Sequence, residues 1–192
     1  QTTTENPLKA NTFLVWQGGD VKNFELRVSF RLTGQNTNNF GNSGIQYRSK
    51  VLDAATFVVG GYQMDIDLSG RYTGMLYEEK GRGIIMGPGA KIKVGETATD
   101  PNTKTKKTSV EKLSGAIPAA EVLAAYKIGD WNDVVIVARG NHLQQFLNGK
   151  LTADVTDTDA TLGAASGVLA LQLHTGTPMT IQFKNLQLKT LP

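Results

Sequence analysis

The sequence predicts an all-β fold, an antiparallel sandwich of two sheets with one short helix. Two observations favour this class. Many short segments alternate apolar and polar residues, which is the pattern of a strand with one buried face. Glycine, asparagine and aspartate separate these segments at close intervals, as the turns between antiparallel strands require. Because only one segment has a helical pattern, we expect two sheets packed face to face.

Length and composition indicate a single domain and exclude several kinds of function. The 192 residues are expected to form a single domain spanning residues 1–192, because sandwiches of this size commonly form one unit. The formal net charge of +3 is too small to predict a nucleic-acid partner. The chain has no cysteine, which excludes disulfides, thiolate metal sites and cysteine nucleophiles. No apolar run approaches the ~20 residues that span a bilayer, so we expect no membrane span.

The first part of the chain predicts two strands and a loop. Residues 12–17 are a short apolar strand. Residues 24–32 give the clearest strand of the chain, because apolar residues such as Phe24 and Val28 alternate with polar ones, and we expect this apolar row in the core. Residues 34–44 are rich in glycine and asparagine, which predicts a loop.

Residues 42–67 predict two strands that share a polar face. Successive side chains of a strand point to opposite faces, so the row containing Tyr47 and the row containing Met64 point away from the polar residues between them. The residues expected together on the polar face are Gln46, Arg48, Gln63, Asp65 and Asp67. Such a face is either a solvated exterior or the floor of a polar groove.

The middle of the chain predicts a strand, tight turns and an irregular segment. Residues 72–78 have the pattern of a strand, and the glycines that follow predict turns. Tyr77, Glu78 and Arg82 lie where strand and turns meet, and loops at such a place often rim a groove. Residues 87–117 are expected to be a long surface excursion with little regular structure.

A helix follows this segment. Pro118 precedes the stretch AAEVLAAYK and Gly129 follows it, which predicts a short helix. Residues 131–139 are apolar on both faces and fit a central strand. Asn148 and Gly149 then predict a two-residue turn between two strands of a hairpin.

Two further strands complete the chain. Residues 167–174 alternate again, with Gln172 and His174 on the side opposite the leucines. In the last strand, at 179–188, the apolar phase slips, which predicts a bulge near Asn185.

These segments together resemble one known family. The stretches FELRVSFRL, NSGIQYRS, GYQMDID, YTGMLYEEKGRG, DWNDVVIVARGN and LALQLH occur in an order that resembles the 3-keto-disaccharide hydrolase domain. The resemblance covers nearly the whole chain. It implies a concanavalin-like jelly roll and an exported bacterial protein, periplasmic or secreted, that acts on sugars oxidised at the 3-position. The first residues, QTTTENP, lack the basic and apolar regions of a signal peptide, so we expect any such signal to have been removed.

The chain departs from this family at one strand. Many members carry a Glu and then a Gln where this chain has Gln63 and Asp65, so a catalytic role of that glutamate does not carry over to Gln63. A weaker resemblance is to jelly-roll glycosidases with Glu-x-Asp-x-Glu on one strand, because Gln63, Asp65 and Asp67 have the same spacing. The usual nucleophile of those enzymes would be missing here.

The catalytic candidates are Arg48, Asp65, Asp67 and His174, which we expect to converge on one polar groove. The two aspartates suit an acid/base pair or shared metal binding. Arg48 is suited to binding a substrate oxygen or to stabilising an enolate, because its guanidinium is permanently charged. His174 suits a general base, because histidine titrates near neutrality. Each candidate also has a structural alternative. The two aspartates could be solvated carboxylates, Arg48 could form a cross-strand ion pair, and His174 could be a capped, hydrogen-bonded structural histidine. The substrate-binding candidates are Gln46, Gln63, Tyr77, Glu78, Arg82 and Gln172.

Two functions fit these residues. The first is a hydrolase that cleaves the glycosidic bond of a 3-keto sugar, either a 3-keto-disaccharide or a 3-keto-glucoside, by acid/base or elimination and hydration chemistry. The C3 ketone acidifies the hydrogen on C2, so no carboxylate nucleophile is needed. The second is a non-catalytic carbohydrate-binding module, since jelly rolls serve both purposes. The aspartates, amides and histidine identify no cofactor, but they leave a divalent metal such as calcium open.

Overall fold

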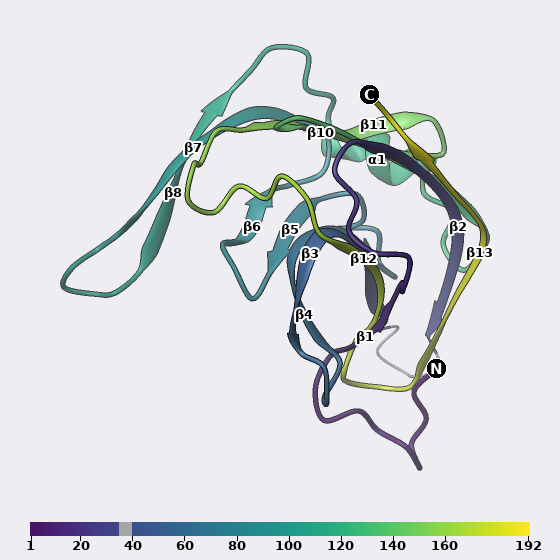
Figure 1. The fold of residues 1–192 in the computed structure, drawn as a ribbon. Coiled ribbons are helices and arrows are strands. Elements are labelled where there is room, and N and C mark those ends of the chain that lie inside the picture. The colour runs from purple at the N-terminus through teal and green to yellow at the C-terminus, as the bar shows by residue number, and fades with distance from the viewer. Residues whose placement is uncertain (35–39) are drawn as a thin grey trace.

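The computed structural model describes residues 1–34 and 40–192. In these residues the strands form a six-stranded sheet, in the order β1-β12-β3-β4-β5-β6, and a seven-stranded sheet, in the order β13-β2-β9-β10-β11-β7-β8. Neighbouring strands are antiparallel except for β7 and β11, which are parallel. The two sheets form the layers of a sandwich (Figure 1), which confirms the predicted fold class. The elements are β1 (Thr12–Val15), β2 (Phe24–Gly34), β3 (Asn42–Asp53), β4 (Val58–Asp67), β5 (Leu76–Glu79), β6 (Gly83–Met86), β7 (Ala90–Thr99), β8 (Lys106–Lys112), α1 (Ala119–Ala125), β9 (Asn132–Arg139), β10 (His142–Leu147), β11 (Lys150–Asp157), β12 (Val168–Leu173) and β13 (Met179–Thr190).

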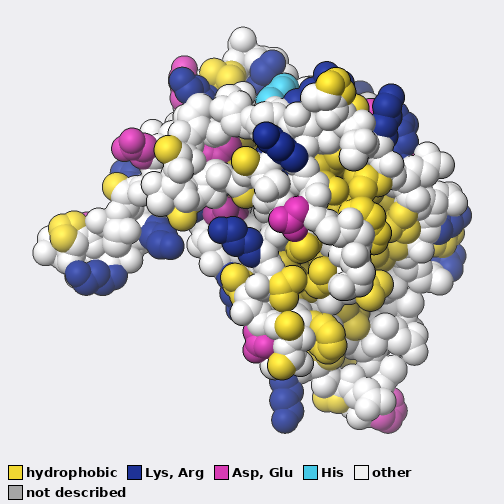
Figure 2. Space-filling model, viewed as in Figure 1, with side chains coloured by type: hydrophobic (Ala, Val, Ile, Leu, Met, Phe, Trp, Pro, Cys, Tyr) yellow, Lys and Arg dark blue, Asp and Glu magenta, His cyan; other side chains and the backbone are white. Residues whose placement is uncertain are grey.

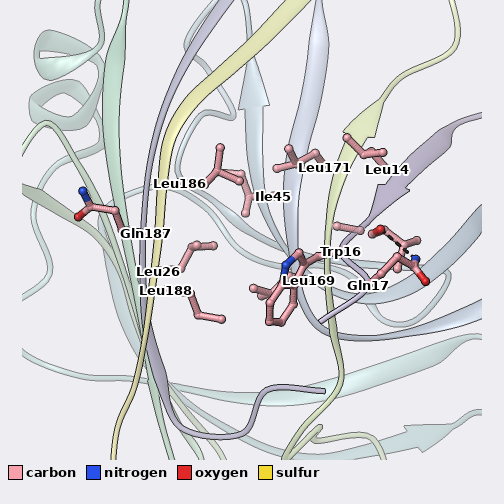
Figure 3. A pocket seen from close by; sticks show the side chains of 12 residues that line it. Leu14, Trp16, Gln17, Leu26, Ile45, Leu169, Leu171, Leu186, Gln187 and Leu188 are labelled. Atoms are coloured by element: carbon pink, nitrogen blue, oxygen red, sulfur yellow. Dashed lines mark hydrogen bonds between the residues drawn. The ribbon is translucent and has the colours of Figure 1, made fainter. Parts of the chain in front are cut away.

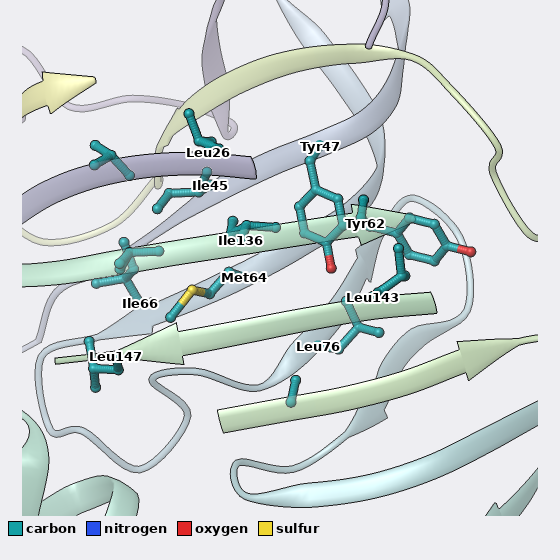
Figure 4. Close-up of a cluster of buried hydrophobic side chains, with 14 of the residues drawn as sticks. Leu26, Ile45, Tyr47, Tyr62, Met64, Ile66, Leu76, Ile136, Leu143 and Leu147 are labelled. Atoms are coloured by element: carbon teal, nitrogen blue, oxygen red, sulfur yellow. The ribbon is translucent and has the colours of Figure 1, made fainter. Parts of the chain in front are cut away.

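The core lies between the inner faces of the two sheets. Phe24 and Val28 of β2 are buried there, as their alternation predicts. They belong to one hydrophobic cluster with Ile45, Tyr47 and Met64 of the six-stranded sheet. Figure 4 shows the side chains of β3 and β4 meeting those of β9 and β10 in this layer. Because these residues all point inward, the polar residues between them on β3 and β4 face away from the core.

The predicted turn and bulge are confirmed. Asn148 and Gly149 both have positive φ, 48° and 80°, which the tight turn between β10 and β11 requires. The register of β13 against β2 shifts between Lys184 and Gln187, and Asn185 has a φ of 56°. The helix predicted after Pro118 is α1, with Pro118 at its N-cap.

The prediction for residues 87–117 is wrong. This segment carries β7 and β8, and β7 pairs with β11 to extend the seven-stranded sheet. Ile92 and Val94 of β7 are buried in the core. The residues AKIKV alternate with the period of a strand. This signal is short, and the exposed stretch after it shows no such alternation, so the segment as a whole does not have the pattern of a strand. Figure 1 shows β7 and β8 continuing together as an arm that extends from the body.

Smaller differences concern the neighbouring segments. The strand predicted at 72–78 begins only at Leu76, because the residues before it form a turn. β6 occupies a stretch where only turns are predicted. Of the loop predicted at 34–44, residues 35–39 lie outside the described residues, and Asn42 already begins β3. Within the described part of the chain, no helix is long and apolar enough to cross a membrane.

Candidate functional site

A polar pocket of about 260 Å³ lies on the face of the six-stranded sheet that points away from the core. Its position follows from strand alternation, because Gln63 and Asp65 alternate with the buried residues of β4. The pocket has polar and apolar lining residues. The polar ones are Asn11, Asn42, Gln63, Asp65, Glu79 and His174. The others are Tyr72, Met75, Tyr77 and Ile84.

Asp65 is the central acid of the pocket. Its side chain is held by two amides, because Gln63 Nε2 donates to Oδ1 at 2.9 Å and Asn42 Nδ2 donates to Oδ2 at 3.2 Å. Burial raises the pKa of Asp65 to about 7, against the lowering effect of the two amide hydrogen bonds. The negative charges of Asp67 and Glu79 add to this rise. Asp65 can therefore give or accept a proton near neutral pH.

A chain of amides fixes this carboxyl group. Gln46 Nε2 donates to Gln63 Oε1 at 2.7 Å, and Ser49 Oγ donates to Gln46 Oε1 at 2.7 Å. The Gln63 side chain lies directly over Gly44, where an added Cβ would come within 2.3 Å of Gln63 Cδ. Glycine at position 44 therefore leaves the space in which Gln63 reaches Asp65.

Glu79 is the second buried carboxyl group of the pocket. Gln172 Nε2 donates to Glu79 Oε2 at 3.3 Å. Burial raises the pKa of Glu79, while the charges of Lys80 and His174 and the hydrogen bonds of Asn11 and Gln172 lower it. Gln172 Oε1 is buried and has no hydrogen-bond partner among the described residues. Glu79 and His174 line the same pocket, and the charge of His174 acts on Glu79.

His174 follows β12 and has a defined tautomer. Its Nδ1 lies at hydrogen-bond distance from the carbonyl oxygen of Thr175, which can only accept, so Nδ1 carries the hydrogen. The ring packs against Phe40, with 5.8 Å between the ring centroids. In neutral His174, Nε2 is therefore the nitrogen that can take a proton.

The structure does not bring Arg48 into this pocket, and the predicted convergence is wrong for this residue. Arg48 has a φ of 47° at a bulge, where the register of β3 against β4 shifts, so the alternation is broken at this position. Its guanidinium is buried and donates to the backbone carbonyls of Lys22, Gly140 and Ala164. Arg48 thus joins β3 to loops next to the other sheet.

Three other candidates also lie outside the pocket. Asp67 is at the end of β4, where its carboxylate accepts a hydrogen bond from the Ser69 hydroxyl. Glu78 points to the face opposite the pocket, because it alternates with Tyr77 and Glu79. There Arg82 Nε binds Glu78 at 2.7 Å. Arg82 also binds Asp157 at 2.6 Å, so the two acids share one arginine in a buried ion-pair network.

Six predicted residues belong to the polar pocket or support it. Gln63 and Tyr77 line it together with Asp65 and His174. Gln46 and Gln172 lie behind and bind lining residues. Sequence reasoning missed the pocket residues Asn11, Asn42, Tyr72, Met75, Glu79 and Ile84. Strand parity could have found Glu79, since it lies two residues beyond Tyr77.

No metal cluster is formed by the residues that the structure describes. Among them, no group of three or more His, Cys, Asp or Glu side chains is placed to hold a metal ion. The calcium site considered from the sequence stays a prediction.

A second cavity, of about 380 Å³, lies between the edges of the two sheets. It is lined by β1, β12 and β3 on one side and by β2 and β13 on the other, as Figure 3 shows. Figure 2 shows a band of hydrophobic side chains on this side of the molecule, between β12 and β13. None of the lining residues is titratable, so this apolar cleft supplies no acid or base. Two further cavities, of about 420 and 370 Å³, are lined by Glu78 and by Asp157, and both of these acids are paired with Arg82. The raised pKa of Asp65 instead favours the polar pocket as the candidate site.

Comparison with known proteins first defines the class. The structure resembles carbohydrate-binding module CBM66 of Bacillus subtilis, with a TM-score of 0.55 and 14% identity over 99% of this chain and 90% of that one. It also resembles a protein described as a candidate glycosyl hydrolase of Parabacteroides distasonis, with a TM-score of 0.55 and 17% identity over 95% and 85% of the two chains. These matches identify the sandwich as a jelly roll.

The family is shown by the sequence itself. The chain belongs to the family of 3-keto-alpha-glucoside-1,2-lyase-like domains, whose model matches residues 2–189. The resemblance found from the sequence is thereby confirmed. Among curated proteins no sequence matches the chain. The family places the protein among carbohydrate-related, hydrolase-like domains.

Proposed function

We propose that the protein cleaves the glycosidic bond of 3-keto sugars in the polar pocket, by elimination and then hydration. The observation that carries this proposal is the pair formed by Asp65 and His174. A buried carboxyl group with a pKa of about 7 and a histidine with a free Nε2 line one pocket of about 260 Å³. Such a pair can supply both an acid and a base near neutral pH.

The first step removes the hydrogen on C2 of the sugar. Nε2 of His174 takes this proton, and the electron pair of the C–H bond moves into the enolate of the C3 ketone. The hydroxyl of Tyr77 lines the pocket, and burial raises its pKa, so it keeps its proton and can donate to the enolate oxygen. Arg48 cannot take this role, because its guanidinium is bound to three backbone carbonyls.

The second step breaks the bond between C1 and the glycosidic oxygen. As the enolate collapses to a C1=C2 double bond, the electron pair of the C–O bond leaves with the oxygen, and protonated Asp65 gives its proton to it. Water then adds across C1=C2 to give the free 3-keto sugar. The amides of Asn42 and Gln63 hold the Asp65 carboxylate that remains.

A second function, carbohydrate binding without turnover, is favoured by the amide-rich wall of the pocket. Asn11, Asn42 and Gln63 offer donors and acceptors that suit sugar hydroxyls whether or not a bond is broken. The two functions differ in what the protein does to a bound keto sugar.

One experiment separates them. The protein is incubated with a 3-keto-disaccharide and with the unoxidised disaccharide, and the release of monosaccharide is followed. We expect release from the keto sugar alone, because only the ketone acidifies the hydrogen on C2. Binding of either sugar without release would support the binding module, and equal release from both would contradict the elimination route.

A further inference from the structure

The polar pocket has two walls of different chemistry, and strand order separates them. One wall carries Asn42, Asp65 and His174, from β3, β4 and the end of β12. The other carries Tyr72 and Ile84, from the turn before β5 and from β6, and Tyr77 and Glu79 of β5 lie between the two walls. Since β5 and β6 form the edge of the six-stranded sheet, the apolar wall stands on the outer side of the pocket.

The apolar wall is open to solvent. Ile84 is 59% exposed and Tyr72 is 38% exposed, although both line the pocket. Met75 also lines the pocket and is buried. The guanidinium of Arg71 lies over the ring of Tyr72, with 5.1 Å to the ring centroid. Large apolar side chains exposed beside a polar pocket are a common feature of ligand-binding sites, because a bound ligand covers them.

Asp65 stands at the border between the two walls. Its backbone N–H donates to the carbonyl oxygen of Met75 at 3.2 Å, so the acid adjoins the first residues of the apolar wall. On the other side Asn42 binds its carboxylate. If Asp65 protonates the glycosidic oxygen, that oxygen lies at this border. The sugar ring then extends toward His174, and the leaving group extends toward Tyr72 and Ile84.

We propose that the apolar wall of Tyr72, Met75 and Ile84 binds the leaving group, so that the preferred substrates are 3-keto-glycosides of apolar or aromatic alcohols rather than 3-keto-disaccharides. This inference rests on the proposed function. A sugar leaving group would bring hydroxyls against Ile84 and Met75, which offer no hydrogen bond in exchange for lost water. An aromatic leaving group would instead remove apolar surface of both partners from water.

The test compares two substrates that share the keto sugar, a benzyl 3-keto-glucoside and a 3-keto-disaccharide. Benzyl alcohol is no better a leaving group than a sugar hydroxyl, so a higher kcat/KM for the benzyl compound reports binding. The variant Ile84→Thr keeps a β-branched side chain of similar shape and adds a polar atom. The matched control is Ile128→Thr, because Ile128 is 57% exposed and lies in the turn after α1.

We expect the wild type to prefer the benzyl compound. Ile84→Thr should lower kcat/KM for that compound about fivefold, the scale of a lost apolar contact, and should change the disaccharide value less than about twofold. Ile128→Thr should change neither. Equal or better turnover of the disaccharide by the wild type, or an equal loss for both substrates in Ile84→Thr, would overturn the inference alone. Turnover of neither keto substrate would overturn the proposed function with it.

Discussion

Gln63 Nε2 donates a hydrogen bond to Oδ1 of Asp65, two residues later on the same strand, at 2.9 Å. The two side chains stand on one face because the period of a strand is two. The hydrogen bond from Gln63 stabilises the ionised form of Asp65, while burial of Asp65 favours its neutral form. The pKa of Asp65 is a balance of these two effects, and changing either one shifts it in a known direction.

Replacing Gln63 by leucine should raise the pKa of Asp65. The hydrogen bond from Gln63 lowers this pKa, so its loss leaves burial less opposed. We expect a rise of about one unit from the wild-type value, since one charge-assisted hydrogen bond contributes on the order of 1.5 kcal/mol. Titration of the Asp65 carboxyl carbon by NMR measures it. An unchanged or lower pKa in Gln63→Leu would contradict the role assigned to this bond.

The raised pKa of Asp65 should also make stability depend on pH. Folding raises this pKa from 3.8 to about 7, so the folded protein holds a proton that the unfolded chain has released. The contribution of Asp65 to stability is therefore fully present below about pH 4 and is lost as pH rises through about 7. The loss amounts to at most about 4 kcal/mol.

Asp65→Asn provides the comparison, because its side chain does not titrate. The free energy of unfolding of wild type minus variant should fall between about pH 4 and about pH 8, as measured by urea denaturation. A difference that is constant or rises with pH would show that the folded protein does not favour protonated Asp65.

Arg48→Ala should destabilise the fold by about 3 kcal/mol or more. The change removes a buried guanidinium and leaves the carbonyls of Lys22, Gly140 and Ala164 without their donor. Arg27→Ala is the matched control, because Arg27 pairs with Glu25 on the exposed surface and should cost less than about 1 kcal/mol. Similar stabilities of the two variants in urea denaturation would contradict the structural role of Arg48.

Sequence reasoning went furthest where alternation is unbroken. On β2 and β4 it predicts which residues point to the core, and the row Gln63 and Asp65 on the other face of β4 follows directly from it. It fails at Arg48, because a bulge with positive φ reverses the parity that the sequence pattern implies. Nothing in the types of the neighbouring residues indicates that bulge.

Other parts of the site depend on contacts between distant segments. Asn11 and Tyr72 enter the pocket from outside the strands, where alternation gives no information. Glu79 shares the parity of Tyr77 but lies one residue beyond the strand predicted at 72–78, so the pattern alone does not include it. The order of strands, which separates the two walls of the pocket, is set by non-local pairing and cannot be read from single segments.

Val94→Asp should prevent stable folding, although Val94 lies in a segment that the sequence predicts to be a surface excursion. Val94 is fully buried in the core, so the change would bury an unpaired charge. Val110→Asp is the matched control, because Val110 pairs with Val94 in register but is 42% exposed on β8. We expect the control to melt close to the wild type. A cooperatively folded Val94→Asp protein of wild-type stability would show that β7 is not part of the core.

The last prediction compares the two histidines of the chain. His174→Ala should lower turnover of a 3-keto sugar by a factor of about 10² or more, the scale of a lost general base. His142→Ala should leave turnover unchanged, because His142 lies on the seven-stranded sheet and binds Asp154 at 2.7 Å. Both side chains are only partly buried, so neither change should lower the melting temperature much.

The pH profile adds a check on the acid of the pocket. In the wild type, kcat/KM should fall on the alkaline side as Asp65, with its pKa of about 7, loses its proton. The residual activity of His174→Ala should keep this alkaline fall, because Asp65 is unchanged. A His174→Ala variant with full activity would show that another group removes the proton on C2.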